Sequence, residues 1–583
     1  MWINNTNIYQ IYPLGFCGCE TFRADFDGNT APGRILKIID LIPHLKNMNF
    51  NAVLFNPVFE SVKHGYDTVD FYKIDGRLGT NDDFKRVCEK LHENGIRVIL
   101  DGVFNHVGRD HYAFADLQKN GSGSYYKEWF AGVNFGERSP MGDNFSYEAW
   151  QNHYELVKLN LWNGDVVNHI FGAVKMWIDE WGIDGLRFDA ADCLSFDFIK
   201  ACHNYTKSLR DDFWLMGEII HGDYSRWANA EMFDCVTNYQ CQKGIYSSHN
   251  DKNYFEISSS LEQQKNQYRN IYMYNFADNH DVNRLTSLLK NKSDAPLCYT
   301  MIYTMYGVPA VYYGSEWGIT GAKGQGAEAD APLRPSFDVL KNAEHDGALA
   351  LHISKLGEIR KNLDILQYGQ YERFFLNNKT LVYKRVLDNK TAYCAFNIDD
   401  KDYTFGIPST TEFWVDCLTG ERFKTFDGEV KVTLKPETSM ILVEQHIYND
   451  IFGDTIIEEK TENTEIAENI KEEIIPETIA ETKAEAAQEF TIQARVSENK
   501  SISKGGVTPI GKKEGRTVKV GGTYKHFKGG TYTVLMLAKD HEDASEQVIY
   551  VKLDDGSIWV RPAEMFLEEV DDHGNIKERF QLM

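Results

Sequence analysis

Short runs of β-branched and aromatic residues alternate with amphipathic stretches from residue 8 to about residue 318. Eight such runs begin at Ile8, Ala52, Arg97, Gly185, Phe213, Met232, Met273 and Ala310. This alternation is typical of parallel βα units, and eight units in one chain favour a closed barrel over an open sheet. We therefore predict an α/β fold with a (β/α)8 barrel, in which helices such as the one from Val166 to Trp181 form the outer ring.

The spacing of these units is uneven after the third strand. About 60 residues, 107–165, show little periodicity but contain many glycines and aromatic residues. A connection of that length is usually functional, so we predict an inserted subdomain above the barrel mouth. Most of its aromatic side chains are expected to form the subdomain's own core; they are Tyr112, Tyr125, Tyr126, Trp129, Phe130, Phe145 and Trp150.

The pattern changes again beyond the barrel, which we place within residues 1–367. Alternating segments predict an antiparallel β domain over 368–446. Residues 447–515 are expected to form an acidic, largely disordered linker, because Glu473, Glu477, Glu481, Glu485 and Glu489 repel at a spacing of four. Strand-like alternation returns over 516–583, which predicts a separate small β domain with no assigned role or partner.

Composition narrows the classes of partner and the location. The formal net charge of -24 argues against nucleic acid, whose phosphates are bound by clustered Lys and Arg. No stretch is apolar and long enough to span a bilayer, and the first residues lack the basic and apolar pattern of a signal peptide. The 10 cysteines show no paired framework. We therefore expect a cytoplasmic protein with neither membrane nor nucleic acid as a partner.

Polar side chains gather where four of the predicted barrel strands end, which is where such barrels place catalytic groups. A single Asp at a strand end is usually a turn former or a helix cap, but four polar ends on one rim are harder to explain in that way. The residues are Asp101, Asn105 and His106 on the third strand, Arg187 and Asp189 on the fourth, Glu218 on the fifth, and Asp278, Asn279, His280 and Asp281 on the seventh.

Two of these carboxylates are expected to lie in contrasting surroundings. Arg187 and Asp189 are two apart on one strand, so their side chains leave the same face, and the guanidinium is expected to keep Asp189 ionised. Glu218 follows an apolar run, and desolvation there would favour its protonated form. One ionised and one protonated carboxyl suit glycosidic cleavage with retention, in which the first attacks the sugar and the second protonates the leaving oxygen.

Four motifs in this order resemble the four conserved regions of the alpha-amylase family, glycoside hydrolase family 13. They are DGVFNH at 101–106, GLRFDAA at 185–191, GEI at 217–219 and FADNHD at 276–281. The resemblance covers roughly residues 1–446. It implies that Asp189 is the nucleophile, Glu218 the acid/base and Asp281 the stabiliser of the transition state.

The same resemblance implies the remaining site residues. His64 and Tyr66, in the motif KHGYDTVDFY, look like the loop in which an aromatic ring stacks on glucose. The substrate-binding set is then Tyr66, His64, Asp101, His106, Arg187 and His280. No cofactor is expected to be required, although Asn105 resembles a calcium ligand of the family.

One departure narrows the activity that the resemblance implies. Many alpha-amylases carry Lys-His after the nucleophile, whereas this chain has Ala191-Asp192-Cys193. The chain is therefore more similar to cyclomaltodextrinases, neopullulanases or maltodextrin glucosidases, which act on maltodextrins and starch. The C-terminal segment, with YKHFKGGTYTVL and WVRPAEMF, resembles a small bacterial domain of unknown function.

Three functions stay open at this point. The first is hydrolysis of alpha-1,4-glucosidic bonds, and the second is glycosyl transfer by a 4-alpha-glucanotransferase-like enzyme, since water and an acceptor hydroxyl compete for one covalent intermediate. The third is a non-catalytic sugar-binding scaffold, which the presence of all three carboxylates disfavours.

Overall fold

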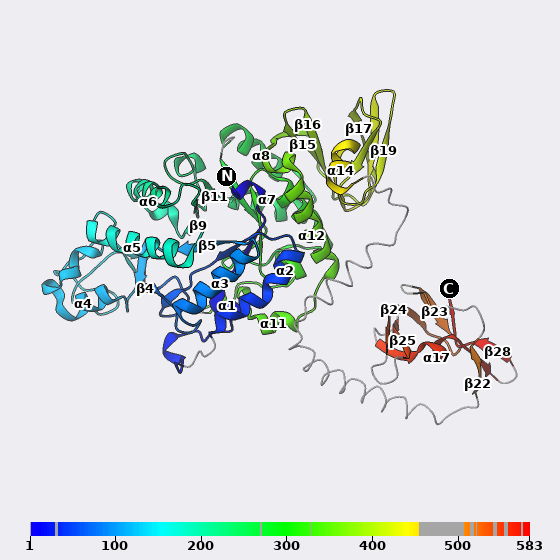
Figure 1. Ribbon diagram of the computed structural model, residues 1–583, viewed down its shortest axis with the longest axis horizontal. Helices are drawn as coiled ribbons and strands as arrows, with labels where there is room; N and C mark the ends of the chain where they lie inside the picture. The colour runs from blue at the N-terminus through cyan, green and yellow to red at the C-terminus, as the bar shows by residue number, and fades with distance from the viewer. Residues whose placement is uncertain are drawn as a thin grey trace. The chain divides into compact units, whose positions relative to one another are not determined.

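Each of the eight apolar runs forms a parallel strand of one closed barrel, as the sequence predicts (Figure 1). A computed structural model describes residues 2–28, 33–268, 271–326, 328–453, 507–512, 518–519, 522–539, 545–552, 558–572 and 575–582. The barrel strands are β1 (Ile8–Ile11), β2 (Ala52–Phe55), β5 (Arg97–Gly102), β9 (Gly185–Phe188), β10 (Trp214–Gly217), β11 (Cys235–Thr237), β12 (Tyr272–Phe276) and β13 (Val308–Tyr312). They pair in the order β1-β13-β12-β11-β10-β9-β5-β2, which closes on itself.

Helices surround these strands, as expected of a (β/α)8 barrel. The longer ones are α3 (Asn81–Glu93), α5 (Gly164–Trp181), α6 (Phe196–Leu209), α7 (Tyr239–Asn250), α8 (Phe255–Gln267), α10 (Ala295–Thr304) and α12 (Gly347–Asn362). Helix α5 begins two residues before the predicted start, because the Asn163 side chain accepts hydrogen bonds from the Asp165 and Val166 amides. Among the described residues, no helix is long and apolar enough to cross a membrane.

Two hydrophobic layers hold the barrel. One lies between strands and helices, and its largest fully buried side chain is Trp177 of α5. The other fills the barrel interior with residues such as Ile99, Trp214 and Met216. Because side chains alternate along a strand, Ile99 is followed on the inner face by Asp101, and Met216 by Glu218. The interior therefore changes from apolar at the base to polar at the carboxyl ends of the strands.

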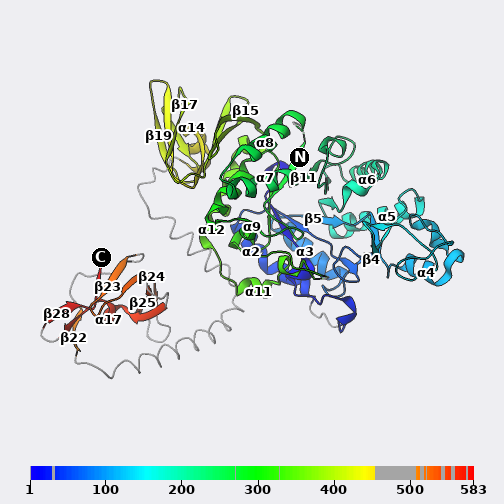
Figure 2. The same cartoon turned by 180° about the vertical axis from the view of Figure 1, so that it is seen from behind.

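The segment after β5 forms a subdomain of its own, with a three-stranded sheet in the order β6-β8-β7. Its elements are β6 (His106–Gly108), α4 (Tyr112–Asn120), the short 3-10 helices η4 (Gly121–Gly123) and η5 (Tyr125–Trp129), β7 (Ala149–Trp150) and β8 (His153–Lys158). Trp129, Phe130 and Phe145 are buried in its core. Tyr112 and Tyr125 are not, since they are 44% and 73% exposed. In the cartoons, α4 lies on the opposite side of the barrel from the antiparallel domain (Figures 1 and 2).

The antiparallel domain is one eight-stranded sheet in the order β14-β15-β16-β21-β18-β19-β20-β17. Its strands are β14 (Gln370–Leu376), β15 (Thr380–Leu387), β16 (Lys390–Asn397), β17 (Tyr403–Pro408), β18 (Phe413–Asp416), β19 (Arg422–Phe426), β20 (Glu429–Leu434) and β21 (Thr438–Glu444). Val382, Trp414 and Leu442 belong to its buried core.

The bounds predicted for the acidic linker, 447–515, need correction at both ends. Helix α14 (Gln445–Phe452) follows β21 directly, and its Ile447 and Tyr448 are each only 7% exposed against the antiparallel domain. Most residues of the acidic run follow this helix in the sequence, so their charges do not prevent its packing. At the other end, β22 (Val507–Lys512) pairs with β27 (Glu568–Asp572). Residues 454–506, on which the prediction of disorder falls, lie outside the described residues.

The C-terminal residues form a compact unit within Ile475–Met583, separate from the unit Met1–Ile474. A five-stranded sheet has the order β26-β25-β24-β23-β29, with β23 (Thr523–His526), β24 (Thr531–Lys539), β25 (Glu546–Lys552), β26 (Ile558–Pro562) and β29 (Phe580–Leu582). A second sheet joins β22, β27 and β28 (Asn575–Glu578), and α17 (Ala563–Leu567) adds Phe566 to the core. The predicted small β domain is confirmed.

Asp184 supports the barrel at its amino-terminal face, the end of the strands opposite the polar rim. Its carboxylate accepts hydrogen bonds from His92, Arg97, Arg210 and the Val98 amide, at 2.5 to 2.9 Å. Burial opposes its ionisation, but the hydrogen bonds from His92, Val98 and Arg210 outweigh burial and lower the pKa of Asp184 to about 2.

We expect Asp184→Asn to lower the free energy of unfolding at pH 7 by at least about 2 kcal/mol, the value of a pKa drop of this size. The folded pKa lies below the unfolded one, so the contribution is complete above about pH 4. It is lost as the pH falls toward 2. The two proteins should therefore converge in acid, as thermal unfolding between pH 7 and pH 3 would show. Asp179→Asn, which breaks an exposed pair with Lys175, is the matched control and should change little. Equal melting temperatures of Asp184→Asn and the parent at pH 7 would contradict this role.

Candidate active site

The polar rim is built from residues that continue the inward-facing rows of the barrel strands. Gln10 follows Ile8 on β1 and Arg187 follows Gly185 on β9, each two residues further along. Asp101 ends the same row of β5, while Asn56 and Glu218 come directly after β2 and β10. All five side chains are buried. The alternation of the strands thus brings residues far apart in sequence to one polar layer.

Arg187 is the centre of this layer and is 3% exposed. Its Nη2 lies 2.7 Å from Glu218 Oε1, while its Nη1 contacts Asp101 Oδ2 and lies 3.5 Å from Asp189 Oδ1. One guanidinium therefore contacts three carboxylates, and its bond to Glu218 is shorter than its contact with Asp189.

This arrangement differs from the electrostatic expectation for Asp189 and Glu218. Burial raises the pKa of Asp189 well above its usual range and the nearby Glu218 charge adds to this, while Arg187 acts in the opposite direction. Glu218 is not in apolar surroundings: Tyr239 Oη donates to its Oε1 at 3.1 Å, and the Ala190 amide donates to its Oε2 at 3.2 Å. The spacing of Arg187 and Asp189 indicated the shared face correctly. The spacing did not show that the guanidinium would contact three carboxylates.

A strained turn links the two carboxylates. Ala190, directly after Asp189, has φ 43°, the left-handed region that a residue with a Cβ rarely adopts. In this conformation its amide reaches the Glu218 carboxylate, and the Ala191 amide donates to the Glu218 carbonyl at 3.1 Å. The end of β9 is thereby fastened to the end of β10.

Asp281 lies across the rim and is more open, with 37% of its side chain exposed. Its Oδ2 is 2.9 Å from His280 Nε2, and its Oδ1 accepts a hydrogen bond from Arg334 Nη2 at 3.0 Å. Although burial favours the neutral acid, the neighbouring His280 and Arg334 outweigh it and hold the pKa of Asp281 below its usual range. Asp281 is thus a fixed anion beside the Asp189–Glu218 pair.

Tyr66 is brought to the same place by the loop after β3 (Phe59–Ser61). Its Oη donates to Asp101 Oδ2 at 3.0 Å and contacts His280 Nε2, and its ring lies nearly parallel to that of His280, with centroids 5.4 Å apart. His280 thus meets the hydroxyl edge of the Tyr66 ring. The predicted stacking of Tyr66 on a sugar stays a prediction.

His106 and His64 complete the predicted set. His106 is 1% exposed, and its Nε2 has no hydrogen-bond partner within the described part of the chain. Burial lowers the pKa of His106 to about 3, so the ring is neutral at pH 7. His64 Nδ1 accepts from the Tyr66 amide at 3.2 Å and so shapes the Tyr66 loop. A neutral His106 with an unused nitrogen suits a hydroxyl ligand.

Several residues of the rim were missed by the sequence analysis. Asn56 and Tyr239 stand just beyond the carboxyl ends of β2 and β11, so the rule that examined the other strand ends would have found them. Gln10 is a polar residue inside an apolar strand, which is also a visible signal. Arg334 comes from a loop far beyond β13, and no local pattern marks it.

Calcium at Asn105 remains a prediction. The Asn105 amide donates to His106 Nδ1 at 3.1 Å. Across the described ranges, no group of three or more His, Cys, Asp or Glu side chains has an arrangement that could hold a metal ion. The expectation that no cofactor is required is likewise untested.

Comparison with known proteins assigns the barrel to a family. Residues 10–350 match the alpha amylase catalytic domain. The chain belongs to the alpha-amylase family. The resemblance carried by the four motifs is thereby confirmed, and the chain is a glycoside hydrolase of this family. Residues 522–582 match a protein of unknown function, DUF1653.

Three relatives of this alpha-amylase family member are informative. A cyclomaltodextrinase from Bacillus sp is 31% identical over 432 residues, 69% of this chain and 74% of that protein. Neopullulanase 2 of Thermoactinomyces vulgaris is 30% identical over 469 residues, 76% of this chain and 78% of that protein. The crystal structure of an Anoxybacillus alpha-amylase is 26% identical, with a TM-score of 0.64, and the alignment covers 76% of this chain and 98% of that one.

Gln10 determines which nitrogen of His280 carries the proton. Tyr274 Oη donates to Gln10 Oε1 at 2.9 Å, which directs Gln10 Nε2 to Asn56 Oδ1 at 3.0 Å and to His280 Nδ1 at 3.2 Å. His280 Nδ1 therefore accepts, and the proton lies on Nε2, toward Asp281.

We expect Gln10→Leu to lower kcat by roughly tenfold to a hundredfold, because it leaves buried polar groups without partners and frees the His280 tautomer. Steady-state kinetics on maltotriose would measure the loss. Tyr9→Phe is the control on the same strand, since it removes a buried hydrogen bond to Glu316 away from the rim. It should lower the melting temperature and spare kcat. An unchanged kcat in Gln10→Leu would refute the role of Gln10.

Proposed function

We propose that this enzyme hydrolyses alpha-1,4-glucosidic bonds of maltooligosaccharides or related alpha-glucans by double displacement with retention. The observation that carries the proposal is the meeting of Asp189, Glu218 and Asp281 on one rim, with Arg187 in contact with the first two. Because a single guanidinium contacts both Asp189 and Glu218, their carboxyl groups face the same part of the rim. This suits retention, in which one carboxylate attacks the sugar and the other acts first as acid and then as base.

The proposed reaction has two steps. In the first, the Asp189 carboxylate attacks the anomeric carbon while the Glu218 carboxyl donates a proton to the leaving oxygen. The bond to the leaving sugar breaks as the glycosyl ester forms. In the second step, Glu218 takes a proton from water, and the resulting attack releases Asp189. Positive charge on the sugar ring develops in both transition states, and the fixed Asp281 anion stabilises it.

The proposed mechanism requires Asp189 to be ionised when substrate is bound. Burial and the nearby Glu218 charge raise the pKa of Asp189, and the contact with Arg187 opposes that rise. Arg187 is therefore the group on the rim that favours an ionised nucleophile.

The surrounding residues would bind sugar hydroxyls. Asp101 Oδ1 and His106 Nε2 are buried polar atoms without partners among the described residues, and both lie in the polar layer of the rim. With His280, Tyr66, His64 and Arg187, they form the proposed substrate-binding set. The names of the relatives, cyclomaltodextrinase and neopullulanase 2, favour maltodextrins as the substrate class.

A cytoplasmic location is part of the same proposal. All 10 cysteines are described and none forms a disulfide, which suits a reducing compartment.

We expect Asp189→Asn to abolish turnover with the fold intact, since an amide cannot form the glycosyl ester. Release of reducing ends from maltotriose and circular dichroism would be measured together. Near-normal activity in a pure, undeamidated sample would exclude Asp189 as the nucleophile.

Glu218→Gln should lose activity selectively. Hydrolysis of 4-nitrophenyl alpha-maltoside, whose leaving group needs little protonation, should fall less in its first step than hydrolysis of maltotriose. Pre-steady-state kinetics on both substrates would separate the steps, and equal losses would exclude the acid role.

Product analysis distinguishes the proposed hydrolysis from its alternatives. Proton NMR of the first product should show the alpha anomer, and the beta anomer would contradict retention. A panel of maltotriose, cyclodextrin, starch, pullulan, isomaltose, sucrose and trehalose would define the linkage. Early accumulation of sugars longer than maltotriose would favour glycosyl transfer, and binding without any cleavage would favour a scaffold.

A further inference from the structure

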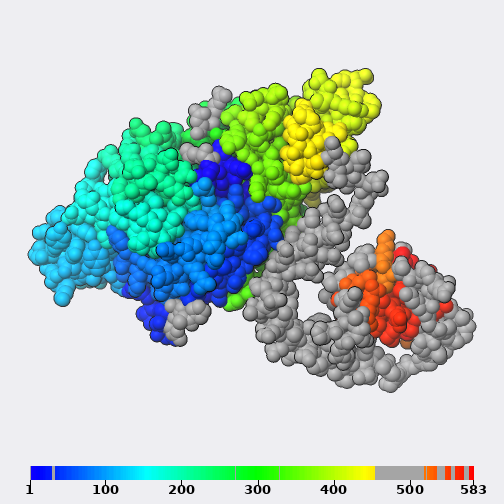
Figure 3. Space-filling view, in the orientation of Figure 1, coloured from blue at the N-terminus to red at the C-terminus, as the bar shows by residue number. Residues whose placement is uncertain are grey.

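The inserted subdomain displays aromatic rings to solvent at its surface. Trp162 is 75% exposed, Tyr125 73% and Phe135 40%, whereas Trp129, Phe130 and Phe145 of the same subdomain and its core are buried. Figure 3 shows this segment, in light blue, as the surface at the end of the barrel unit. Single exposed apolar residues are ordinary, but a Trp and other aromatic rings on one small subdomain indicate a contact surface.

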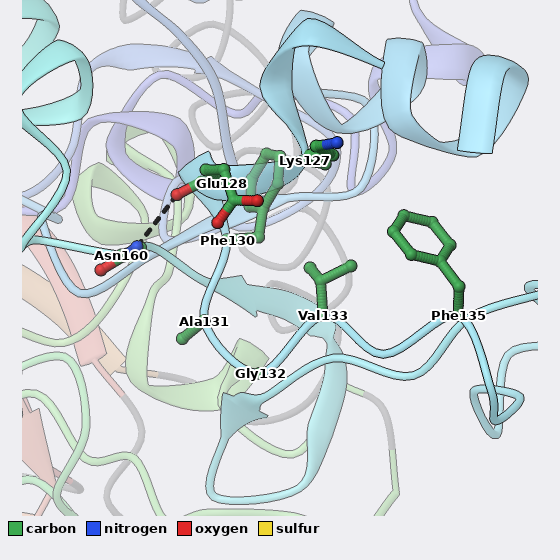
Figure 4. A pocket seen from close by; sticks show the side chains of 8 residues that line it. All are labelled: Lys127, Glu128, Phe130, Ala131, Gly132, Val133, Phe135 and Asn160. Atoms are coloured by element: carbon green, nitrogen blue, oxygen red, sulfur yellow. Dashed lines mark hydrogen bonds between the residues drawn. The ribbon is translucent and has the colours of Figure 1, made fainter. Parts of the chain in front are cut away.

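A groove of about 330 Å³ lies in the same subdomain (Figure 4). It is lined by Lys127, Glu128, Phe130, Ala131, Gly132, Val133, Phe135 and Asn160. In the close view, the Phe135 ring stands on one side, Asn160 and Glu128 stand on the other, and the small residues Ala131 and Gly132 lie between. The groove thus has an aromatic side, a polar side and an open floor.

The backbone of Trp162 lies next to Asn160, on the polar side of this groove. The Asn160 amide donates to the Glu128 carbonyl at 3.0 Å, and Asn163 donates to the same carbonyl at 3.3 Å. The Trp162 backbone amide donates to Asn160 Oδ1 at 3.2 Å. These hydrogen bonds fix the backbone of the loop that carries Trp162 next to the groove wall.

We propose that this groove, with Trp162 and Phe135, is a second binding site for an alpha-glucan chain, built entirely from the inserted subdomain. The choice of ligand rests on the proposed function. Glucose rings have apolar faces that suit Trp162 and Phe135, and hydroxyls that suit the Asn160 amide and the Lys127 and Glu128 side chains. The Glu128 carboxylate disfavours a polyanion, and the charged wall disfavours an apolar peptide.

A site of this kind binds without cutting. It would hold a long glucan near the enzyme and raise the local concentration of bonds at the catalytic rim. A long chain offers many more bonds per bound molecule than a short one, so the effect should depend on chain length.

The test measures binding apart from turnover. Full-length Glu218→Gln protein is run in native gels containing amylopectin, and the dissociation constant is taken from the retardation. Adding Trp162→Ala and Phe135→Ala should raise that constant at least tenfold. Phe426→Ala, an equally exposed ring of the antiparallel domain at 71%, is the matched control and should leave it unchanged. Unaltered retardation in the Trp162→Ala/Phe135→Ala protein overturns the proposal.

Kinetics in the otherwise native enzyme provide the second measurement. The Trp162→Ala/Phe135→Ala variant should keep kcat/KM for maltotriose within twofold and lose several-fold on soluble starch. An equal loss of kcat/KM on both substrates would mean that the groove acts through the catalytic rim. That result would also overturn the proposal. Absence of hydrolysis in the parent would contradict the proposed function alone, because retardation does not depend on cleavage.

Discussion

The proposed catalytic rim depends on one buried cation. Arg187 contacts Asp101, Asp189 and Glu218, which come from three neighbouring strands. Three carboxylates could not be placed together in the mouth of a barrel without such a group, because their mutual repulsion and desolvation would be too costly. A single guanidinium faces three acids in the centre of this layer, and burial and the Glu218 charge raise the pKa of Asp189 while Arg187 lowers it.

The barrel strands place Arg187 and the three acids next to one another. Its inner rows alternate with the outer ones, so the apolar filling at Ile99 and Met216 leads directly to Asp101 and Glu218. Residues of the proposed active site and residues that fill the core are therefore successive members of the same rows. A shift of register by one residue in β5 or β10 would turn these acids out of the mouth, which is why the hydrophobic pattern and the site must agree.

The sequence predicted the barrel, the insertion and the rim because these follow from local patterns. Apolar runs at regular intervals indicate βα units, and polar residues at strand ends indicate a mouth. Two kinds of feature could not be predicted in this way. Arg334 reaches Asp281 from a distant loop, and the division of Arg187 among three acids depends on distances between strands that no single strand specifies. The helix α14 was missed for a different reason, since it precedes most of the acidic run, and its buried Ile447 and Tyr448 pack against the antiparallel domain.

The turn at Ala190 has a consequence for how the enzyme responds to heat and to substrate. A left-handed residue with a Cβ costs roughly 1 kcal/mol, and the hydrogen bonds to Glu218 hold it in place. Segments held against their backbone preference are among those that open locally before a protein unfolds. The rim should therefore open at a lower free energy than the barrel wall beneath it. By the proposed function, a bound sugar would contact Asp189 and Glu218 and close that opening, so the substrate would stabilise the part of the enzyme that binds it.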